Sequence, residues 1–532
     1  MKTVALIPAA GSSSRFRELG KHYAKTVLPF RGRPIIAHIT DRIVAANPTI
    51  DKIFIVVNNA IHRKQLEDAI ETCDTNSIGL CVVHEFSESD IEFKRGPAKT
   101  IVAGLELIRS RYQEDVEVLV HLSDSLFDIG DIEALIDEPG AVIGTQQVED
   151  QRRWCVVDCE TQFHNKPTVA IPGAEALSGL YKFRLDSIDL SRVKFNDSES
   201  QISDLLETIN ESIRTIRAPI ELDFGTLEDY IANRGITKSR SFNEVFDRGN
   251  SVVKTTSIGS DTMFDSKLRR EINWYSHAPV SLKPFLPSIY RHSDLSDTRE
   301  RASFCMEKIK GVNLRDMALY LDRSEETWRE IFTQYKSEVY DKSLNVSRSF
   351  RSNIFWMEVF AKTHTRLSAV KIAERDETDS FMDIFRSFCY DRDQLNRTDW
   401  IHGDLHFANM FYDLQRRELK MIDPRGELCG DLLYDLAKLN HSVNGNYDCI
   451  DNQLYYFDQN GEFKFFMTER SGIVTAFENM LVDIGFTDQD RRNLDLVTAS
   501  LFLSMIPLHY HNETNQRLFY NEYRRFLSLY TS

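Results

Sequence analysis

A segment in the C-terminal half contains a carboxylate and an amide at a spacing that suits phosphoryl transfer from ATP. Asp404 and Asn409 lie in the segment Ile401–Phe411, and Asp423 follows a short apolar run that is typical of a β-strand. In phosphoryl transfer, one carboxylate orients the attacking hydroxyl, while an amide and a second carboxylate hold Mg²⁺. The segment therefore predicts this chemistry, with Asp404 beside the hydroxyl and with Asn409 and Asp423 as the ligands of Mg²⁺.

A second polar group lies at the other end of the chain, where an apolar strand runs directly into a glycine- and serine-rich turn. The turn consists of Gly11, Ser12, Ser13 and Ser14 and ends in Arg15. Glycine permits a tight backbone turn, and successive N–H groups together with an arginine can cradle a polyphosphate. The turn lacks the Gly-Lys-Ser/Thr ending of a P-loop, so it does not indicate a Walker-type NTPase. A plain loop is the alternative interpretation.

Length, composition and charge place the chain among folded multidomain proteins. A chain of 532 residues is too long to fold around one ordinary hydrophobic core. Its hydrophobic fraction of 42% is enough to form the cores of several domains. We find no apolar run of about 18 residues for a membrane span and no secretory segment, so a cytoplasmic location is expected. A net charge of −16 argues against nucleic acid or an anionic membrane as the main partner. The expected partners are small molecules.

A polar stretch separates two predicted domains that differ in their patterns of apolar residues. Residues 1–235 alternate apolar strands with segments of helical period, which predicts a doubly wound, Rossmann-like α/β domain with a mostly parallel sheet. Ligands of such a sheet lie at the carboxyl ends of its strands. Residues 236–532 begin with short strand-like pieces, at about 240–311, and continue with long helical patterns, at about 312–532. This order predicts a small β-rich lobe followed by a larger helical lobe.

Further motifs of the N-terminal domain form an ordered set with the glycine- and serine-rich turn. Lys25 precedes a Leu-Pro pair, Asp124 closes a predicted strand, Lys166 lies in Asn-Lys-Pro, and Asp223 lies in Leu-Asp-Phe-Gly. In this order, the motifs resemble the nucleotidyltransferases that make NDP-sugars and CDP-alcohols from an NTP and a phosphorylated substrate. Asn165 replaces the usual glutamate of that family, which leaves the identity of the acceptor open.

This resemblance implies a role for each motif. Attack of a phosphate oxygen on an α-phosphorus must pass through dense negative charge, which cations neutralise. Alternatively, the first aspartate of the set could cap a helix and the second could stabilise a turn. The implied contacts are Gly11, Ser12, Ser13, Arg15 and Lys25 to the NTP phosphates, Gly96 and Ala98 to the nucleobase, Lys166 to the acceptor phosphate, and Asp124 and Asp223 to Mg²⁺.

The C-terminal domain resembles the aminoglycoside phosphotransferase and choline kinase superfamily, whose members are related to protein kinases and phosphorylate small-molecule alcohols. The resemblance rests on the segments His402–Asn409, Ile422–Pro424 and Gly430–Ala437. The Asp-x-x-x-x-Asn spacing in the first segment equals that of the protein-kinase catalytic loop. It implies a bilobal, protein-kinase-like α+β fold with ATP as a substrate.

The same resemblance implies residue roles in the C-terminal domain. Lys254 fits the strand lysine that contacts ATP phosphates, and Glu271 is its expected partner on the next helix. A lysine on a strand is often merely solvated, which is the alternative for Lys254. Glu307 lies in Met306–Gly311, the expected hinge whose backbone binds adenine. The implied catalytic base is Asp404, and the implied Mg²⁺ ligands are Asn409 and Asp423.

A kinase that makes a phosphomonoester and a nucleotidyltransferase that consumes one form a chemically consecutive pair. We therefore expect a bifunctional enzyme that phosphorylates a sugar or small polyol with ATP and converts the product, with a second NTP, to an NDP-linked precursor of surface polysaccharide or glycoconjugate. One alternative is a choline or amino-alcohol kinase fused to a cytidylyltransferase. Another is that one domain is catalytically silent and senses nucleotide. Pro424, after the predicted metal-binding aspartate, is similar to the proline of sugar-directed members of the superfamily, and Arg425 adds a cation near the γ-phosphate or an anionic substrate; both favour a substrate other than choline.

Overall fold

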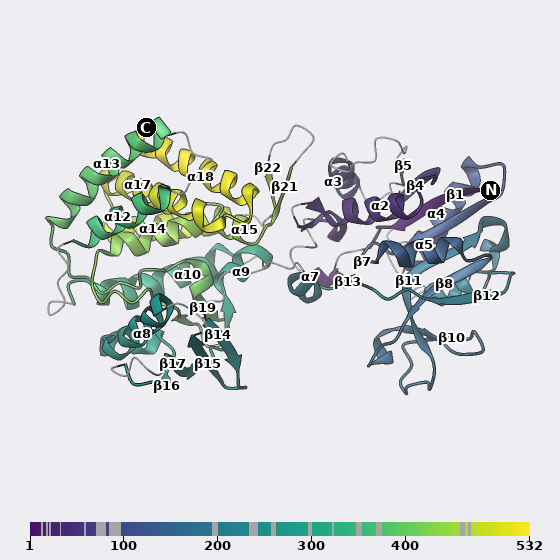
Figure 1. The fold of residues 1–532 in the computed structure, drawn as a ribbon, viewed down its shortest axis with the longest axis horizontal. Coiled ribbons are helices and arrows are strands. Elements are labelled where there is room, and N and C mark those ends of the chain that lie inside the picture. The colour runs from purple at the N-terminus through teal and green to yellow at the C-terminus, as the bar shows by residue number, and fades with distance from the viewer. Residues whose placement is uncertain are drawn as a thin grey trace. The chain divides into compact units, whose positions relative to one another are not determined.

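The structure is a computed structural model that divides into two compact units. The first unit comprises Met1–Gly235 together with Leu454–Phe466, and the second comprises Ile236–Gln453 together with Met467–Ser532 (Figure 1). The first unit therefore includes a short segment from late in the chain. The structure describes residues 1–11, 14–16, 20, 23–31, 33–57, 60–70, 81–84, 97–193, 201–233, 243–256, 262–295, 301–321, 324–346, 354–368, 375–457, 463–466 and 470–532.

The first unit is built on a nine-stranded mixed sheet. Its four consecutive strands β5-β4-β1-β6 are parallel, and β11 then pairs antiparallel with β6. On the other side of β6, β11 pairs antiparallel with β8 and β9, and β8 pairs parallel with β12, so the sheet is mixed, which corrects the expectation of a mostly parallel sheet. The strands are β1 (Lys2–Pro8), β4 (Lys52–Val56), β5 (Cys81–His84), β6 (Val116–His121), β8 (Ala141–Gln146), β9 (Cys155–Val157), β10 (Phe163–Asn165), β11 (Glu175–Arg184) and β12 (Ile213–Arg217).

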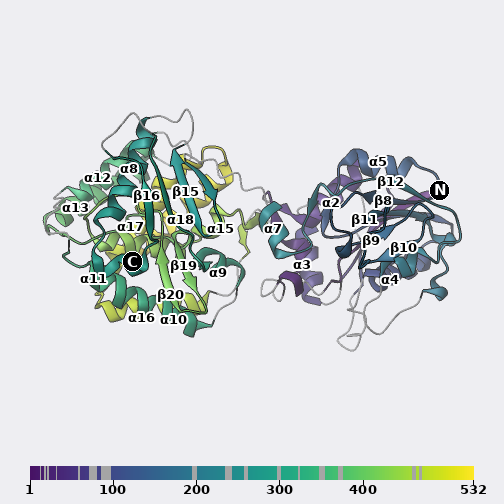
Figure 2. The same cartoon turned by 90° about the horizontal axis from the view of Figure 1, so that it is seen from below.

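Helices cover both faces of this sheet, as Figure 2 shows for α2 and α5 on one side and α4 on the other. Strands that are covered on both faces bury every side chain, which explains the unbroken apolar run of β1. Val4 and Leu6 pack towards α4, in a core shared with Ala98 and Ile101. The helices are α2 (Ile35–Ala46), α3 (Ala60–Ile70), α4 (Pro97–Arg111), α5 (Ile129–Asp137), α6 (Ile202–Leu206) and α7 (Leu227–Asn233), and the short ribbons are β2 (Pro29–Phe30) with β3 (Arg33–Pro34), β7 (Ser125–Leu126) with β13 (Leu222–Asp223), and β21 (Tyr455–Phe457) with β22 (Phe463–Phe465).

The second unit begins with a four-stranded antiparallel sheet in the order β14-β15-β17-β16. Its strands are β14 (Asn243–Asp247), β15 (Ser251–Thr256), β16 (Ile289–His292) and β17 (Ser303–Glu307), and α8 (Thr262–His277) follows β15. A separate three-stranded sheet in this unit consists of β18 (Val312–Asn313), β19 (Met410–Asp413) and β20 (Glu418–Met421). The observed secondary structure agrees with the prediction, because the four-stranded sheet is built from the short strand-like pieces predicted at about 240–311.

The rest of the second unit is helical (Figure 1). The helix α14 is buried along its whole length, so it lies inside this part rather than on its surface. The helices are α9 (Leu314–Tyr320), α10 (Glu325–Gln334), α11 (Asp341–Ser343), α12 (Phe355–Leu367), α13 (Arg375–Asp393), α14 (Leu432–Val443), α15 (Tyr447–Asp451), α16 (Ser471–Ile484), α17 (Asp488–Met505) and α18 (Glu513–Thr531). A C-terminal part rich in helix is therefore confirmed.

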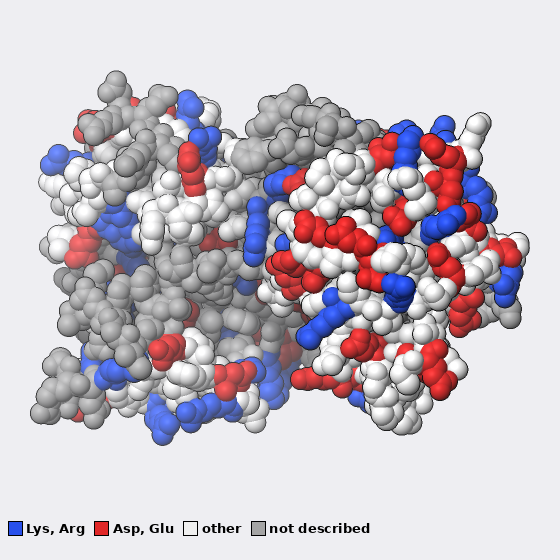
Figure 3. All heavy atoms as spheres, turned by 45° about the vertical axis from the view of Figure 1, so that its right-hand side comes forward, with Lys and Arg blue, Asp and Glu red and all other residues white. Residues whose placement is uncertain are grey.

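Surface charge and hydropathy agree with the composition. Over the N-terminal unit, Figure 3 shows acidic side chains in several groups with basic ones between them. Among the residues that the structure describes, we find no helix with the length and apolar character to span a bilayer.

Candidate active sites

The first candidate site is a cleft at the carboxyl ends of the parallel strands, where ligands of α/β sheets bind. Its volume is about 680 Å³. Residues that are far apart in the sequence come together in the wall of this cleft. The predicted residues that line it are Gly11, Arg15, Lys25, Asp124, Lys166 and Asp223.

Two carboxylates face one small space in this cleft. Asp124 follows β6, and β13 brings Asp223 next to it because Ser125 and Asp223 are paired in the β7–β13 ribbon. A Cβ atom added to Gly225 would lie 3.0 Å from Asp223 Oδ1 and 3.8 Å from Asp124 Oδ2, so both carboxylates border the backbone of this glycine. Mg²⁺ is commonly held by one or two carboxylates together with substrate phosphates. The two aspartates therefore fit a Mg²⁺ that arrives with a nucleotide.

Lys25 stabilises the ionised form of the Asp124 carboxylate. Lys25 Nζ lies 2.5 Å from Asp124 Oδ2. Burial alone would raise the pKa of Asp124, but the charge and hydrogen bond of Lys25 outweigh burial and hold this pKa below its ordinary value. Burial and the charge of Asp124 raise the pKa of Asp223. The two carboxylates are therefore shifted in opposite directions, and a bound cation would stabilise the ionised form of both.

The far end of the cleft is rich in cations. Lys166 lies at the end of β10, and its φ of 46° is in the left-handed region that a non-glycine residue seldom adopts. Such backbone strain is frequently found at ligand sites. Arg152 and Arg153 also line the cleft, and sequence reasoning missed both. The adjacent arginine pair after β8 was the available signal, but such pairs are usually solvated.

Four further predicted nucleotide contacts are not among the described residues that line the cleft. Ser12, Ser13 and Gly96 lie outside the described residues. Ala98 is fully buried in the core between α4 and the sheet, whereas its neighbours Pro97 and Thr100 line the cleft. One face of the first turn of α4 contacts the sheet and another face borders the cleft. Ala98 lies on the face towards the sheet.

Comparisons with known proteins support the interpretation of the N-terminal unit as a nucleotidyltransferase. Residues 4–238 match the family model for "Nucleotidyl transferase". The N-terminal unit is a nucleotidyl transferase domain. A relative named UTP--glucose-1-phosphate uridylyltransferase 1, from Staphylococcus saprophyticus, is 25% identical over 240 residues, and the match covers 39% of this chain and 81% of the relative. A second uridylyltransferase of that organism is 24% identical over 242 residues with the same coverage.

Solved structures of nucleotide-sugar enzymes are among the proteins to which this chain is similar. A crystal structure of UDP-glucose pyrophosphorylase complexed with UDP-glucose is 21% identical, with a TM-score of 0.37. The match covers 45% of this chain and 100% of that chain. A UTP-bound structure from Acinetobacter baumannii is 17% identical with a TM-score of 0.35, and that match covers 44% of this chain and 92% of the other.

Replacing Lys166 with alanine tests the cationic end of the nucleotidyl transferase domain. We expect KM for the phosphorylated acceptor to rise about tenfold or more, because the ammonium that would pair with its phosphate is lost. KM for the NTP should change little. Steady-state kinetics with pyrophosphate release as the signal measures both constants. Lys52→Ala is a matched control, since Lys52 is exposed at the amino end of β4, on the opposite edge of the sheet; an equal rise of both KM values would contradict the assignment.

The second candidate site lies in the C-terminal unit, where one lysine joins three segments. Lys254 on β15 lies 2.8 Å from Glu271 Oε2 on α8 and 3.0 Å from Asp423 Oδ1 after β20. Lys254 and Glu271 are only 8% and 5% exposed. Burial opposes the charge of Lys254, but Glu271 and Asp423 outweigh it and raise the pKa of the lysine. Lys254 is therefore buried and paired with two carboxylates, not a solvated lysine on a strand.

The predicted metal ligands and base lie in the adjoining loops. Asn409 Nδ2 donates to the backbone oxygen of Asp404 at 2.8 Å. Its amide oxygen is the atom that would bind a metal. Asp423 has a φ of 59°, and its N–H donates to the Tyr275 hydroxyl. Its carboxylate is 43% exposed and so remains accessible. Asn409 and Asp423, an amide oxygen and a carboxylate, are the ligand types that Mg²⁺ prefers.

His402 braces these loops. Its Nδ1 accepts from the backbone N–H of Asp404 at 3.3 Å, and its Nε2 donates to the backbone oxygen of Ile422 at 2.9 Å. Burial lowers the pKa of His402 to about 4, so the ring is neutral at pH 7. Asp435 accepts from the N–H groups of His402 and Gly403, both at 2.7 Å. These contacts fix the loop that holds Asp404 and leave no free proton on His402 for transfer.

Sequence reasoning missed Lys438, which lies on α14. Its Nζ is 3.0 Å from Asp404 Oδ1, and the residue is 9% exposed. Burial would raise the pKa of Asp404, but Lys438 and then His406 hold it well below its ordinary value. No signal in the sequence marks this lysine, because the burial of α14 on all sides is visible only in the structure.

Lys438 is expected to affect turnover more than binding. Lys438→Met should lower kcat for the predicted ATP-dependent phosphorylation by about 10²-fold, since the carboxylate that would receive the substrate proton loses its fixed cation. KM for ATP should change by less than about threefold, because ATP is assigned to other residues. Initial rates of ADP release measure both constants. Lys438→Arg should recover part of kcat, and a loss confined to KM would contradict this role.

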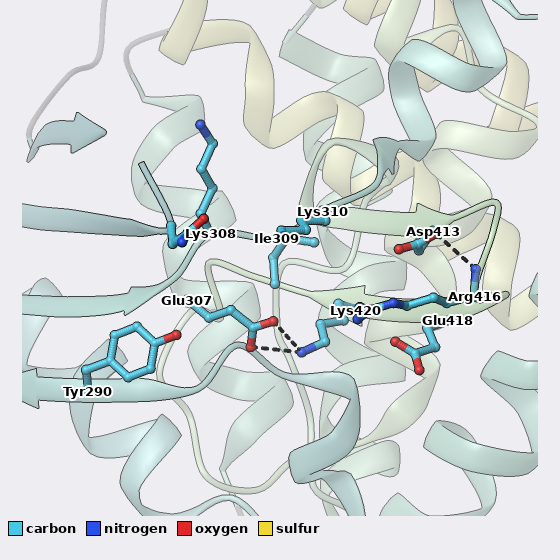
Figure 4. A pocket seen from close by; sticks show the side chains of 10 residues that line it. Tyr290, Glu307, Lys308, Ile309, Lys310, Asp413, Arg416, Glu418 and Lys420 are labelled. Atoms are coloured by element: carbon cyan, nitrogen blue, oxygen red, sulfur yellow. Dashed lines mark hydrogen bonds and ion pairs between the residues drawn. The ribbon is translucent and has the colours of Figure 1, made fainter. Parts of the chain in front are cut away.

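Glu307 does not join the Lys254 cluster. Its carboxylate forms an ion pair with Lys420 at 2.9 Å and accepts from the backbone N–H of Ser288. Figure 4 shows this pair in a pocket of about 220 Å³, with the backbone of Ile309 and Lys310 alongside. The side chain of Glu307 is therefore engaged within the protein, so any contact of this segment with adenine would come from its backbone.

Proposed function

We propose that the protein is a bifunctional enzyme that phosphorylates a small alcohol with ATP in its C-terminal unit and nucleotidylates the product in its N-terminal unit. The nucleotidyl transferase domain supports the second activity. The observation that supports the first is the convergence of Lys254, Glu271 and Asp423, the last of which is 169 residues from the lysine in sequence. An ion pair of this kind beside a metal-binding aspartate is a recurring part of kinase active sites.

In the C-terminal unit, the alcohol oxygen attacks the γ-phosphorus of ATP. The new O–P bond forms as the bond to the β,γ-bridging oxygen breaks, ADP leaves, and the hydroxyl proton passes to Asp404. Lys254 would hold the ATP phosphates, and Asn409 and Asp423 would hold Mg²⁺, which neutralises the phosphate charge when bound. Lys438 keeps Asp404 ionised and therefore able to take the proton.

The architecture of the C-terminal unit is consistent with a bilobal, protein-kinase-like fold. An antiparallel sheet precedes a helical part, α8 follows the lysine-bearing strand β15, and the segment after β17 connects the two parts. We include this fold in the proposal. The loop before β19 and the segment after β20 form the catalytic core of this proposal, because they contain Asp404 and Asp423.

In the N-terminal unit, a phosphate oxygen of the phosphorylated alcohol attacks the α-phosphorus of an NTP. The bond between the α-phosphorus and the bridging oxygen breaks, and pyrophosphate leaves. Arg15 and Lys25 would contact the triphosphate, Asp124 and Asp223 would hold Mg²⁺, and Lys166 would bind the acceptor phosphate. The names of the matched relatives favour UTP as the first nucleotide to test and a sugar phosphate as the acceptor.

Mass spectrometry of the reaction mixture tests the whole proposal. The purified protein is incubated with Mg²⁺, ATP and each of UTP, CTP, GTP and dTTP against pooled sugars, polyols, sugar acids and amino alcohols. The proposal expects one compound to gain a phosphoryl group and then to appear as an NDP conjugate. A phosphorylated compound that no NTP converts would contradict the consecutive scheme, and conjugation of supplied sugar phosphates without any ATP-dependent step would contradict the kinase assignment.

A further inference from the structure

One tryptophan of this chain lies outside the hydrophobic cores. Of the five tryptophans, four are only 1–4% exposed, namely Trp274, Trp328, Trp356 and Trp400. The fifth, Trp154, is partly exposed and lines the cleft of the nucleotidyl transferase domain. Among the residues that the structure describes, its indole ring has neither an aromatic nor a hydrogen-bond partner. Because tryptophan side chains are mostly buried in proteins, an accessible indole in a ligand cleft is a surface on which a ligand can pack.

The backbone on either side of Trp154 is held in place. Trp154 follows a short 3-10 helical turn (Gln151–Arg153), and its N–H donates to the backbone oxygen of Gln151 at 3.0 Å. The side chain of Gln151 donates to the backbone oxygens of Ile171 and Ala174 and accepts from the N–H of Ile171 at 2.7 Å. The strand β9 begins immediately after Trp154 and pairs with β10 and β11 (Figure 2). A ligand would therefore meet the indole on a segment that is already ordered, which lowers the cost of binding.

Trp154 adjoins the residue assigned to the acceptor phosphate. Cys155 is paired with Asn165 at the end of the β9–β10 ribbon, and the N–H of Lys166 donates to the backbone oxygen of Trp154 at 2.9 Å. Trp154, Asn165 and Lys166 all line the cleft. A phosphate bound to Lys166 would thus have the indole beside it. The group bonded directly to that phosphate would lie next to the indole, and in a sugar 1-phosphate this group is the sugar ring.

Two chemical groups can pack on the face of an indole. One is the apolar C–H face of a sugar ring, and the other is a quaternary ammonium, which the negative face of the aromatic ring attracts. The groups beside Trp154 favour the sugar. Arg153 precedes it and lines the cleft, and the carboxylate of Asp150 is already engaged by Arg152 at 2.8 Å. An ammonium over the indole would meet a neighbouring cation, whereas an uncharged sugar ring would not be repelled.

We propose that Trp154 is the stacking surface for the sugar ring of the acceptor and selects a cyclic sugar phosphate over an open-chain polyol phosphate or phosphocholine. This inference rests on the nucleotidyl transfer in the proposed function and names its acceptor class. It does not depend on the kinase assignment. Lys166 would hold the phosphate, and Asn165, whose amide both donates and accepts, would bind hydroxyl groups at the edge of the ring.

Quenching of tryptophan fluorescence by acrylamide tests this contact without turnover. Since the other four tryptophans are buried, acrylamide should quench chiefly Trp154, and the Trp154→Phe protein gives the residual quenching of the rest. The full chain is mixed with Mg²⁺ and the α,β-imido analogue of UTP, which cannot react. The 1-phosphates of glucose, galactose, mannose and N-acetylglucosamine are then added separately. At least one of them should lower the quenching constant to that of the Trp154→Phe protein.

Two acceptors that carry a phosphate without a sugar ring complete the quenching test. Glycerol 3-phosphate and phosphocholine should leave most of the Trp154 quenching in place. Protection by either of them equal to that by the best hexose 1-phosphate would overturn the inference. Protection by none of the compounds would overturn it as well.

Variants connect the contact to the reaction. Trp154→Ala should raise KM for the preferred hexose 1-phosphate about tenfold or more and change KM for the NTP by less than about twofold, because only the sugar loses its stacking surface. Trp154→Phe should keep the acceptor KM within about threefold, since phenylalanine retains an aromatic face. The signal is pyrophosphate release. Val169→Ala is the control, because Val169 is 76% exposed and is not among the described residues that line the cleft.

The kinetic outcomes separate this inference from the proposed function. An unchanged acceptor KM in Trp154→Ala, or an equal rise of both KM values, would overturn the role of Trp154. If the unmodified protein released no pyrophosphate with any hexose 1-phosphate and any NTP, the nucleotidyl transfer in the proposed function would be wrong. The quenching assay requires no turnover and therefore reports on Trp154 in either case.

Discussion

Asp404→Asn is expected to reduce ATP-dependent phosphorylation by about 10²- to 10⁴-fold, the usual contribution of a positioned general base. The side chain is 38% exposed, so a substrate hydroxyl can reach it, and Lys438 keeps it ionised. Asparagine retains the shape but cannot take a proton. The effect should fall on kcat, because the carboxylate interacts most strongly with the hydroxyl as its proton departs.

Measurement of both half-reactions makes the Asp404 result specific. Pyrophosphate release from an NTP and a supplied phosphorylated acceptor should proceed at the unmodified rate in Asp404→Asn. Asp413→Asn is a suitable control, because Asp413 ends β19 in the same unit and its carboxylate accepts the backbone N–H groups of Gln415 and Arg416 in the following turn. Loss of both activities in a folded Asp404→Asn protein would sink the model of two separate sites.

Asp124→Asn is expected to reduce nucleotidyl transfer by about 10²- to 10³-fold or more. The change removes a carboxylate that would hold Mg²⁺ and also the partner of Lys25, which lies 2.5 Å away. The Lys25 ammonium would then be free to bind the triphosphate in an unproductive position. Both effects act on the charge that builds up around the α-phosphorus, so kcat should fall more than NTP binding weakens.

The Asp124 variant should leave the other half-reaction intact. ADP release in the presence of the alcohol should match the unmodified protein, and the phosphorylated intermediate should accumulate without forming a conjugate. Asp186→Asn is the control, since Asp186 is an exposed partner of Arg184 outside the cleft. Full nucleotidyl transfer by Asp124→Asn, at Mg²⁺ concentrations near those of the unmodified assay, would remove Asp124 from the metal site.

The local parts of both sites were predictable from the sequence because their geometry is set within a few residues. Asp404 and Asn409 share one loop, and the Asn409 amide binds the Asp404 backbone directly. Asp124 ends a strand, and the carboxyl ends of parallel strands meet at one edge of a sheet. The apolar run of β1 predicted a strand buried on both faces, and the core that surrounds Val4 and Leu6 agrees with it.

Tertiary structure alone decided the contacts made between distant segments. Lys438 is an ordinary lysine in the sequence, and only the packing of α14 behind the loop places it 3.0 Å from Asp404. Ala98 belongs to a promising motif, yet the orientation of α4 buries it in the core. Glu307, which lies in the expected hinge, pairs with Lys420, a residue 113 positions away. The physical reason is that a hydrogen-bonded turn or strand end depends on neighbouring residues, whereas ion pairs and burial depend on which surfaces the fold brings together.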